Sequence, residues 1–188
     1  MKRLLLITGD LATGKSRFAG ILSKRYAVPV LYKDKIKEIL CDRLGFSTRE
    51  ENKRLSLAAV DIMIDSFRRA AEISCDMILE ANFKEDELKR IHKIALEFGY
   101  RTLTLVLQAD MDVIYQRFVN RIENEARHPA HISGFDGYES LEKYIIEGRR
   151  VKIFSESIRV DANDFSYQDN ADLLTILDTF MGKDIEND

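Results

Sequence analysis

The first part of the sequence whose residues could carry out chemistry is a glycine-rich stretch that ends in lysine and serine. It matches the pattern G-x-x-x-x-G-K-S and consists of Gly9, Asp10, Leu11, Ala12, Thr13, Gly14, Lys15 and Ser16. An apolar run, Leu4–Thr8, leads into it and a stretch with helical spacing, Lys15–Tyr26, follows, which is the context that this motif requires. Backbone N–H groups in such a loop bind phosphate. We expect Lys15 to reach the β- and γ-phosphates of a nucleoside triphosphate, and the Ser16 hydroxyl to ligate Mg²⁺.

An acidic residue follows the second apolar run, Val28–Leu31. Ligands of parallel sheets bind at the carboxyl ends of the strands, so Asp34 is expected near the phosphates, where a carboxylate can accept the proton of an acceptor hydroxyl. Lys37, one helical turn later, is a candidate for binding an anionic or polar group of the acceptor. The alternatives are that Asp34 caps a helix over Lys35–Leu44 and that Lys37 belongs to a solvated surface.

Two polar residues emerge where the third apolar run, Met77–Ala81, ends. Glu80 is a candidate for holding Mg²⁺ through water or for hydrogen-bonding the acceptor, and Asn82 is a candidate for the second of these roles. The alternative for both residues is a polar strand end that caps the next helix.

Three arginines precede a histidine-rich segment. Arg117 and Arg121 share one face of a predicted helix, and Arg127 is followed by His128-Pro129-Ala130-His131. Guanidinium groups spread charge over phosphate oxygens, so we expect a lid over residues 117–138 that closes on the site. The alternative is a salt-bridged surface helix, and the two histidines are too few for a zinc site.

A last polar element follows the fifth apolar run, Ile158–Val160. The loop after this run is a plausible place for the base of the nucleotide to pack. We expect Asn163 or its neighbours to lie near the edge of the base.

The elements that must position these residues alternate between two kinds. Buried strands are expected over Leu4–Thr8, Val28–Leu31, Met77–Ala81, Leu103–Leu107 and Ile158–Val160. Helices are expected over Lys15–Tyr26, Lys33–Leu44, Thr48 to about Ser74, Glu85–Phe98, Asp110–Arg127, about Gly137–Glu147 and Asp169–Phe180. The stretch Ser47-Thr48-Arg49-Glu50 is typical of a capping box. This alternation predicts an α/β domain over residues 1–188, with a five-stranded parallel sheet covered on both faces.

The composition of the chain limits which partners it could bind and in which cellular compartment we expect it. The chain has 188 residues, 45% of them hydrophobic, and a formal net charge of -3, which argues against duplex nucleic acid or a membrane surface as partner. The apolar run Leu4–Ile7 is too short for a signal-peptide core or a membrane span. Two cysteines, Cys41 and Cys75, form no C-x-x-C pair, so we expect a reducing, cytoplasmic environment.

The motifs together resemble those of small P-loop kinases related to zeta toxins, chloramphenicol phosphotransferase and the kinase domain of polynucleotide kinase, often described as AAA-domain predicted kinases. The resemblance runs nearly end to end, and the segment 127–131 is similar to an R-H-P-G-H signature of that group. It implies a three-layer P-loop NTPase fold with strand order 2-3-1-4-5, ATP and Mg²⁺, Asp34 as the base, and lid arginines that contact phosphates. Many relatives carry Ser, Thr or Gly at the position of Arg17. Arg17 is either a contact for adenine or the α-phosphate, or simply a surface residue. Thr13 and Ala130 also depart from the common glycines.

These features favour an ATP-dependent phosphotransferase that acts on a hydroxyl of a small molecule. Alternatives are a kinase of nucleotide sugars or of polynucleotide ends, and an ATP-binding regulatory protein with slow hydrolysis. We expect the acceptor to bind in the helical region of about residues 33–75. The sequence specifies neither the acceptor nor an oligomeric state.

Overall fold

A twisted parallel sheet forms the middle layer of the protein, whose structure is a computed structural model that describes residues 1–124, 128–131 and 135–183. The strands are β1 (Lys2–Gly9), β2 (Val30–Tyr32), β3 (Met77–Glu80), β4 (Tyr100–Gln108) and β5 (Glu156–Asp161). They lie in the order β2-β3-β1-β4-β5, which confirms the predicted topology. The second strand begins two residues later than expected and runs to Tyr32.

Helices cover both faces of the sheet. They are α1 (Lys15–Tyr26), α2 (Lys33–Leu44), α3 (Arg49–Glu72), α4 (Glu85–Glu97), α5 (Met111–Asn124), α6 (Tyr138–Arg149) and α7 (Ala171–Met181). Two short 3₁₀ helices, η1 (Pro129–His131) and η2 (Ser166–Asp169), complete the elements of the described residues. None of the helices in the described part of the chain is long and apolar enough to cross a membrane.

The core has two halves because side chains alternate between the faces of each strand. On β1, Leu5 and Ile7 pack with α1, α5, α6 and α7, whereas Leu4 and Leu6 pack with α3 and α4. All four side chains are buried. The sheet is therefore the central layer of three, as predicted.

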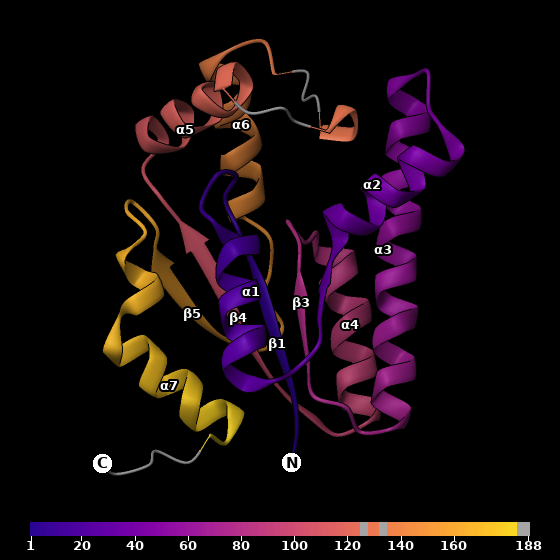
Figure 1. Ribbon diagram of the computed structural model, residues 1–188, viewed down its shortest axis with the longest axis vertical. Coiled ribbons are helices and arrows are strands. Elements are labelled where there is room, and N and C mark those ends of the chain that lie inside the picture. Colours follow the sequence, from indigo (N-terminus) through magenta and orange to yellow (C-terminus); the bar gives the residue numbers. More distant parts are fainter. Residues whose placement is uncertain (125–127, 132–134, 184–188) are drawn as a thin grey trace.

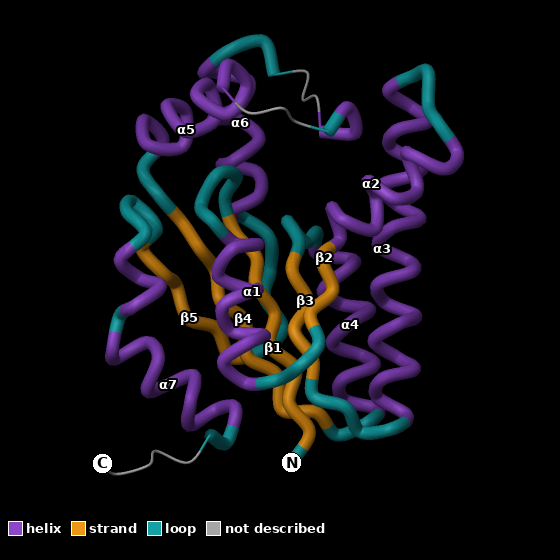
Figure 2. The backbone as a smooth tube through the Cα atoms, viewed as in Figure 1, coloured by secondary structure: helices purple, strands orange, loops and turns teal. Residues whose placement is uncertain are grey.

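The carboxyl ends of the strands lie at one end of the molecule, together with the loop after β1 (Figure 2). Helix α5 and the start of α6 lie above this end, α2 and the start of α3 stand to one side of it, and η1 lies beside α2 (Figure 1). The fold thus gathers the polar residues that follow the strands beneath two groups of helices.

Candidate active site

The loop between β1 and α1 has the backbone of a phosphate-binding loop. Gly9 and Gly14 have φ values of +122° and +81°, and Ala12 has a φ of +59°. A side chain at Gly9 would collide with the backbone of Leu107 on β4, and a Cβ atom at Gly14 would lie 2.8 Å from the hydroxyl of Tyr167. Glycine is therefore required at both positions, by conformation and by packing.

Lys15 lies inside this loop and is buried. Its ammonium group donates a hydrogen bond to the carbonyl of Asp10, which also accepts one from the Thr13 hydroxyl at 2.8 Å. Burial lowers the pKa of Lys15, while the nearby carboxylates of Glu80 and Asp34 act in the opposite direction. The lysine thus lies close to two carboxylates that come from different strand ends.

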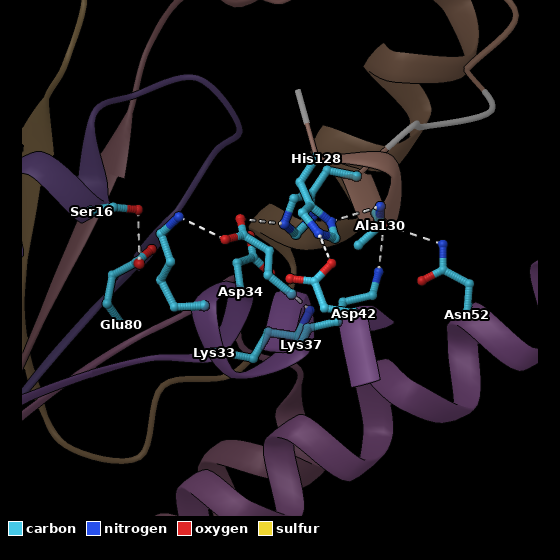
Figure 3. A network of polar contacts seen from close by, with 12 residues as sticks. Ser16, Lys33, Asp34, Lys37, Asp42, Asn52, Glu80, His128 and Ala130 are labelled. Atoms are coloured by element: carbon cyan, nitrogen blue, oxygen red, sulfur yellow. Dashed lines mark hydrogen bonds and ion pairs between the residues drawn. The ribbon is translucent and has the colours of Figure 1, made fainter. Parts of the chain in front are cut away.

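Ser16 and Glu80 form a second pair at the same place. The Ser16 hydroxyl donates to Oε2 of Glu80 at 2.9 Å, which links the start of α1 to the end of β3 (Figure 3). Glu80 is buried, and this burial raises the pKa of its carboxyl group. A hydroxyl and a carboxylate oxygen are ligands that Mg²⁺ accepts, and Mg²⁺ commonly takes only one or two carboxylates besides phosphate. The donor set therefore fits the predicted ion, although no group of three or more His, Cys, Asp or Glu side chains is arranged to hold a metal within the described ranges.

Asp34 lies in the first turn of α2. The helix begins at Lys33 and its N-cap is Tyr32, so the alternative in which Asp34 caps a helix from Lys35 is wrong. Lys33 donates to the Asp34 carboxylate at 3.1 Å. Partial desolvation raises the pKa of Asp34, but the charges of Lys33, His131 and Lys15 outweigh it and hold the pKa below its usual value. Asp34 is therefore ionised at neutral pH, as a base must be.

Lys37 does not lie on a solvated surface, which was the alternative for this residue. It is buried, and its ammonium group donates to the backbone carbonyl of Ala130 at 2.8 Å. Burial lowers its pKa. Its only hydrogen bond among those formed by the described residues is thus to η1, rather than to an open acceptor space.

Arg117 connects three segments around the loop. Its guanidinium group donates to the carbonyls of Ala162 at 2.7 Å and Asn163 at 2.8 Å, with a longer contact to that of Ala12 at 3.4 Å. It also lies over the ring of Phe165 at 4.3 Å from the centroid. Arg117 therefore holds the loop after β5 against the phosphate-binding loop.

The other predicted site residues differ in how closely they approach this loop. Arg121, half-buried on α5, lies near enough for its charge to lower the pKa of Lys15. Arg127 lies outside the described residues, and Arg17 is exposed on the first turn of α1. The Asn163 side chain accepts a hydrogen bond from the backbone N–H of Asp110 at 2.7 Å, so its amide oxygen is engaged with the protein.

Asn82 lines a cavity of about 340 Å³ that lies beside the phosphate-binding loop. Its wall combines apolar, neutral polar and charged side chains, which include Leu11, Phe83, Gln108, Tyr144, Lys84, Glu147, Arg149 and Arg159. This volume is at the lower end of the range for small-molecule sites. The cavity therefore adds a space of suitable size next to the loop.

One functional contact was not predicted from the sequence. The guanidinium group of Arg149, at the end of α6, donates to the carboxylate of Asp10, with Nη2 2.6 Å from Oδ2. The same carboxylate accepts from the backbone N–H of Ala109 at 3.2 Å. The backbone N–H of Asp10 donates to the carbonyl of Leu107 at 2.8 Å, so Asp10 anchors the loop to β4 and α6 through both its backbone and its side chain.

Comparisons with known proteins identify a family and a shared fold. A family model described as "AAA domain" matches residues 4–136, and a search of curated proteins finds no match. A "putative kinase" from Chloroflexus aurantiacus J-10-fl has a similar solved structure, with 26% sequence identity, a TM-score of 0.80, and coverage of 95% of this chain and 96% of that one.

Two more distant structures share the fold. The shikimate kinase of Bacteroides thetaiotaomicron is 14% identical with a TM-score of 0.59, and the match covers 97% of this chain and 99% of that one. The gluconokinase of Sinorhizobium meliloti 1021 is 11% identical with a TM-score of 0.59, and the match covers 97% of this chain and 98% of that one. The three-layer architecture is therefore that of small P-loop kinases.

Proposed function

Because the chain belongs to the AAA domain family, we propose that it is an ATP-dependent phosphotransferase that moves the γ-phosphoryl group of ATP to a hydroxyl of a small molecule. The proximity of Lys15, Glu80 and Asp34 is the observation that carries this proposal. A protein that merely binds a nucleotide needs the lysine and the metal-binding pair, but it does not need a second, ionised carboxylate beside them. The kinase fold of the structural neighbours also supports the proposal.

Each residue has a role in the proposed reaction. The acceptor oxygen attacks the γ-phosphorus, the bond to the bridging oxygen of the β-phosphate breaks, ADP leaves, and the hydroxyl proton passes to Asp34. Lys15 and Arg121 stabilise the charge on the phosphate oxygens. Mg²⁺, held by Ser16 and through water by Glu80, would neutralise charge on the β- and γ-phosphates.

The acceptor side of the site differs from the side that holds the cavity. The cavity beside Leu11 and Asn82 is lined by residues of β1, β4 and α6 and by none of α2 or α3. Helices α2 and α3, within residues 33–75, border the side of the site that carries Asp34, and we assign the acceptor to this side. The segment 117–138, which includes the part of α5 from Arg117 to Asn124, is the proposed lid.

Transfer of label from γ-labelled ATP tests this function. Purified protein is incubated with Mg²⁺ and a panel of sugars, polyols, amino alcohols, nucleosides, nucleotide sugars and oligonucleotides with free ends. The proposal expects label in one class of small alcohol with the wild type and none with Lys15→Ala, whose circular dichroism confirms folding.

The other outcomes contradict the proposal in different ways. Label in a nucleotide sugar or an oligonucleotide end alone would replace the small-alcohol acceptor with that class. Slow phosphate release with no labelled acceptor would favour a regulatory ATP-binding protein. If ATP releases no phosphate and millimolar ATP does not shift the thermal midpoint, the protein does not bind ATP and the proposal is wrong.

A further inference from the structure

The short helix η1 is held against α2 and α3 by polar contacts that no role in phosphate binding explains. The carbonyl of Ala130 accepts hydrogen bonds from Nζ of Lys37 at 2.8 Å and from Nδ2 of Asn52 at 3.2 Å. Lys37 and Ala130 are both buried, with exposed fractions of 8% and 2%. A buried ammonium group is costly unless it is hydrogen-bonded, so this contact strongly favours the docked position of η1.

Two histidines extend the contact on either side of Ala130. The Nδ1 atom of His128 accepts from the backbone N–H of Ala130 at 3.1 Å, which places the proton of the neutral ring on Nε2. That nitrogen lies 2.9 Å from Oδ1 of Asp42, and Nε2 of His131 lies 3.0 Å from Oε1 of Glu38. Both histidines therefore donate to carboxylates on α2 (Figure 3 labels His128 and Asp42). We call these seven residues the Ala130 clasp: Lys37, Glu38, Asp42, Asn52, His128, Ala130 and His131.

The clasp holds the helix that carries the proposed base, and it begins one turn after that base. Asp34 lies in the first turn of α2, three residues before Lys37 and four before Glu38, so the three side chains lie along one side of the helix. His131 also lies close enough to Asp34 for its protonated form to lower the pKa of that carboxyl group. A displacement of η1 would therefore change the surroundings of Asp34 without touching Lys15 or Ser16.

We propose that Lys37 and Asn52 are positioning residues that fix the Asp34 carboxylate for in-line transfer by holding η1 against α2 and α3. This inference rests on the proposed function, because it assigns the clasp to the base of that reaction. It gives Lys37 a role inside the protein instead of a contact with the acceptor. Misplacement of a reacting group by about 1 Å can cost on the order of 100-fold in rate, so loss of one clasp donor is expected to lower kcat by about 10- to 100-fold.

Steady-state ATP hydrolysis tests the clasp before the acceptor is known, because water takes the place of the acceptor hydroxyl. Lys37→Met removes the donor and keeps the aliphatic stem, and the proposal expects a lower kcat with an unchanged KM for ATP. Lys37→Arg keeps a donor and is expected to recover most of the rate. Lys53→Met, an exposed lysine next to Asn52 on α3, is the matched control and should behave as the wild type.

A double substitution shows whether Lys37 acts through Asp34. In the Asp34→Asn background, Lys37→Met should cause no further loss, because the group that it positions is already gone. Asn52→Ala should lower kcat in the same way and serves as a second variant if Lys37→Met fails to fold.

Two results would contradict the positioning role of Lys37 and Asn52 while leaving the proposed function intact. One is a kcat of Lys37→Met and of Asn52→Ala equal to that of Lys53→Met. The other is a full additional loss when Lys37→Met is combined with Asp34→Asn. Failure of the wild type to hydrolyse ATP or transfer phosphate is distinguishable, since it contradicts the proposed function itself.

Discussion

Arg149 at the end of α6 forms a salt bridge with Asp10, the second residue of the phosphate-binding loop, with 2.6 Å between Nη2 and Oδ2. Asp10 is almost fully buried, whereas about a third of the Arg149 side chain is exposed. The same guanidinium group donates to the carbonyl of Ala109, just beyond β4. The shape of the loop is therefore coupled to the end of α6, where Arg149 lies 139 residues after Asp10.

The first prediction follows from this pair. Arg149→Met leaves the buried Asp10 carboxylate without its cation, which should lower the free energy of unfolding by about 3 kcal/mol. It should also weaken ATP binding, because the loop loses its support. Urea unfolding and ATP titration check both effects, with the exposed neighbour Arg150→Met as the control. Equal stability and affinity in the two variants would show that the salt bridge does not support the loop.

The second prediction concerns the cost of keeping Glu80 buried. Because burial raises the pKa of Glu80 in the folded state, the folded protein holds this proton more tightly than the unfolded chain. The free energy of unfolding therefore falls as pH rises above about 4.5, the ordinary value for this group. Glu80→Gln keeps an acceptor for Ser16, so it should raise the thermal midpoint of the unliganded protein at pH 7 and reduce the decline of that midpoint as pH rises above about 4.5.

The Glu80→Gln variant also tests whether Glu80 holds Mg²⁺. Without the carboxylate, the additional stabilisation of the ATP complex by Mg²⁺ should decrease, since Glu80 holds the ion through water in our proposal. Glu85→Gln, at the exposed start of α4, is the control. A Glu80→Gln protein that is less stable at pH 7 and keeps its full Mg²⁺ response would contradict both the cost of burying the Glu80 carboxylate and its role in holding Mg²⁺.

The sheet and the phosphate-binding loop were predictable because their signals are local. Five short apolar runs alternate with helical stretches, and the motif at residues 9–16 requires a strand before it and a helix after it. The strand order was implied by the resemblance and is confirmed. Boundaries were less accurate: the capping box pairs Thr48 with Glu51, not the predicted Ser47 with Glu50, because α3 begins one residue later.

Contacts between distant segments account for the parts of the site that sequence reasoning missed. Arg149 and Asp10 are 139 residues apart, and neither has a periodic pattern that indicates the other. Lys37 looked like an acceptor contact because one turn separates it from Asp34, but its partner is a backbone carbonyl 93 residues away. A carbonyl has no side-chain signature, so no motif indicates this partner.

The third prediction separates two arginines on one face of α5. Arg121 lies near Lys15, so Arg121→Ala should lower kcat for transfer or hydrolysis more than it weakens ATP binding, since charge stabilisation in the transition state affects kcat. Arginines that act on transferring phosphate contribute at most about 10³- to 10⁵-fold. Arg117→Ala should instead raise the KM for ATP, because Arg117 holds the loop after β5. Wild-type turnover in Arg121→Ala would show that Arg121 does not act on the transferring phosphate.

The fourth prediction decides whether Asp34 is a base. Asp34→Asn keeps the size of the side chain and removes its negative charge; the helix loses no cap, because Tyr32 is the N-cap of α2. Stability and ATP affinity should therefore change little, whereas transfer, or hydrolysis as its proxy, should fall by about 10²- to 10⁴-fold, the usual contribution of a general base. Asp65→Asn, an exposed carboxylate on α3, controls for the loss of one charge. The pKa of Asp34 lies below its ordinary value of 3.8, so the wild-type rate should show no loss from protonation of Asp34 between pH 5 and 7. Unchanged rates in Asp34→Asn would make Glu80 the next candidate for the base and would favour a nucleotide-binding role without transfer.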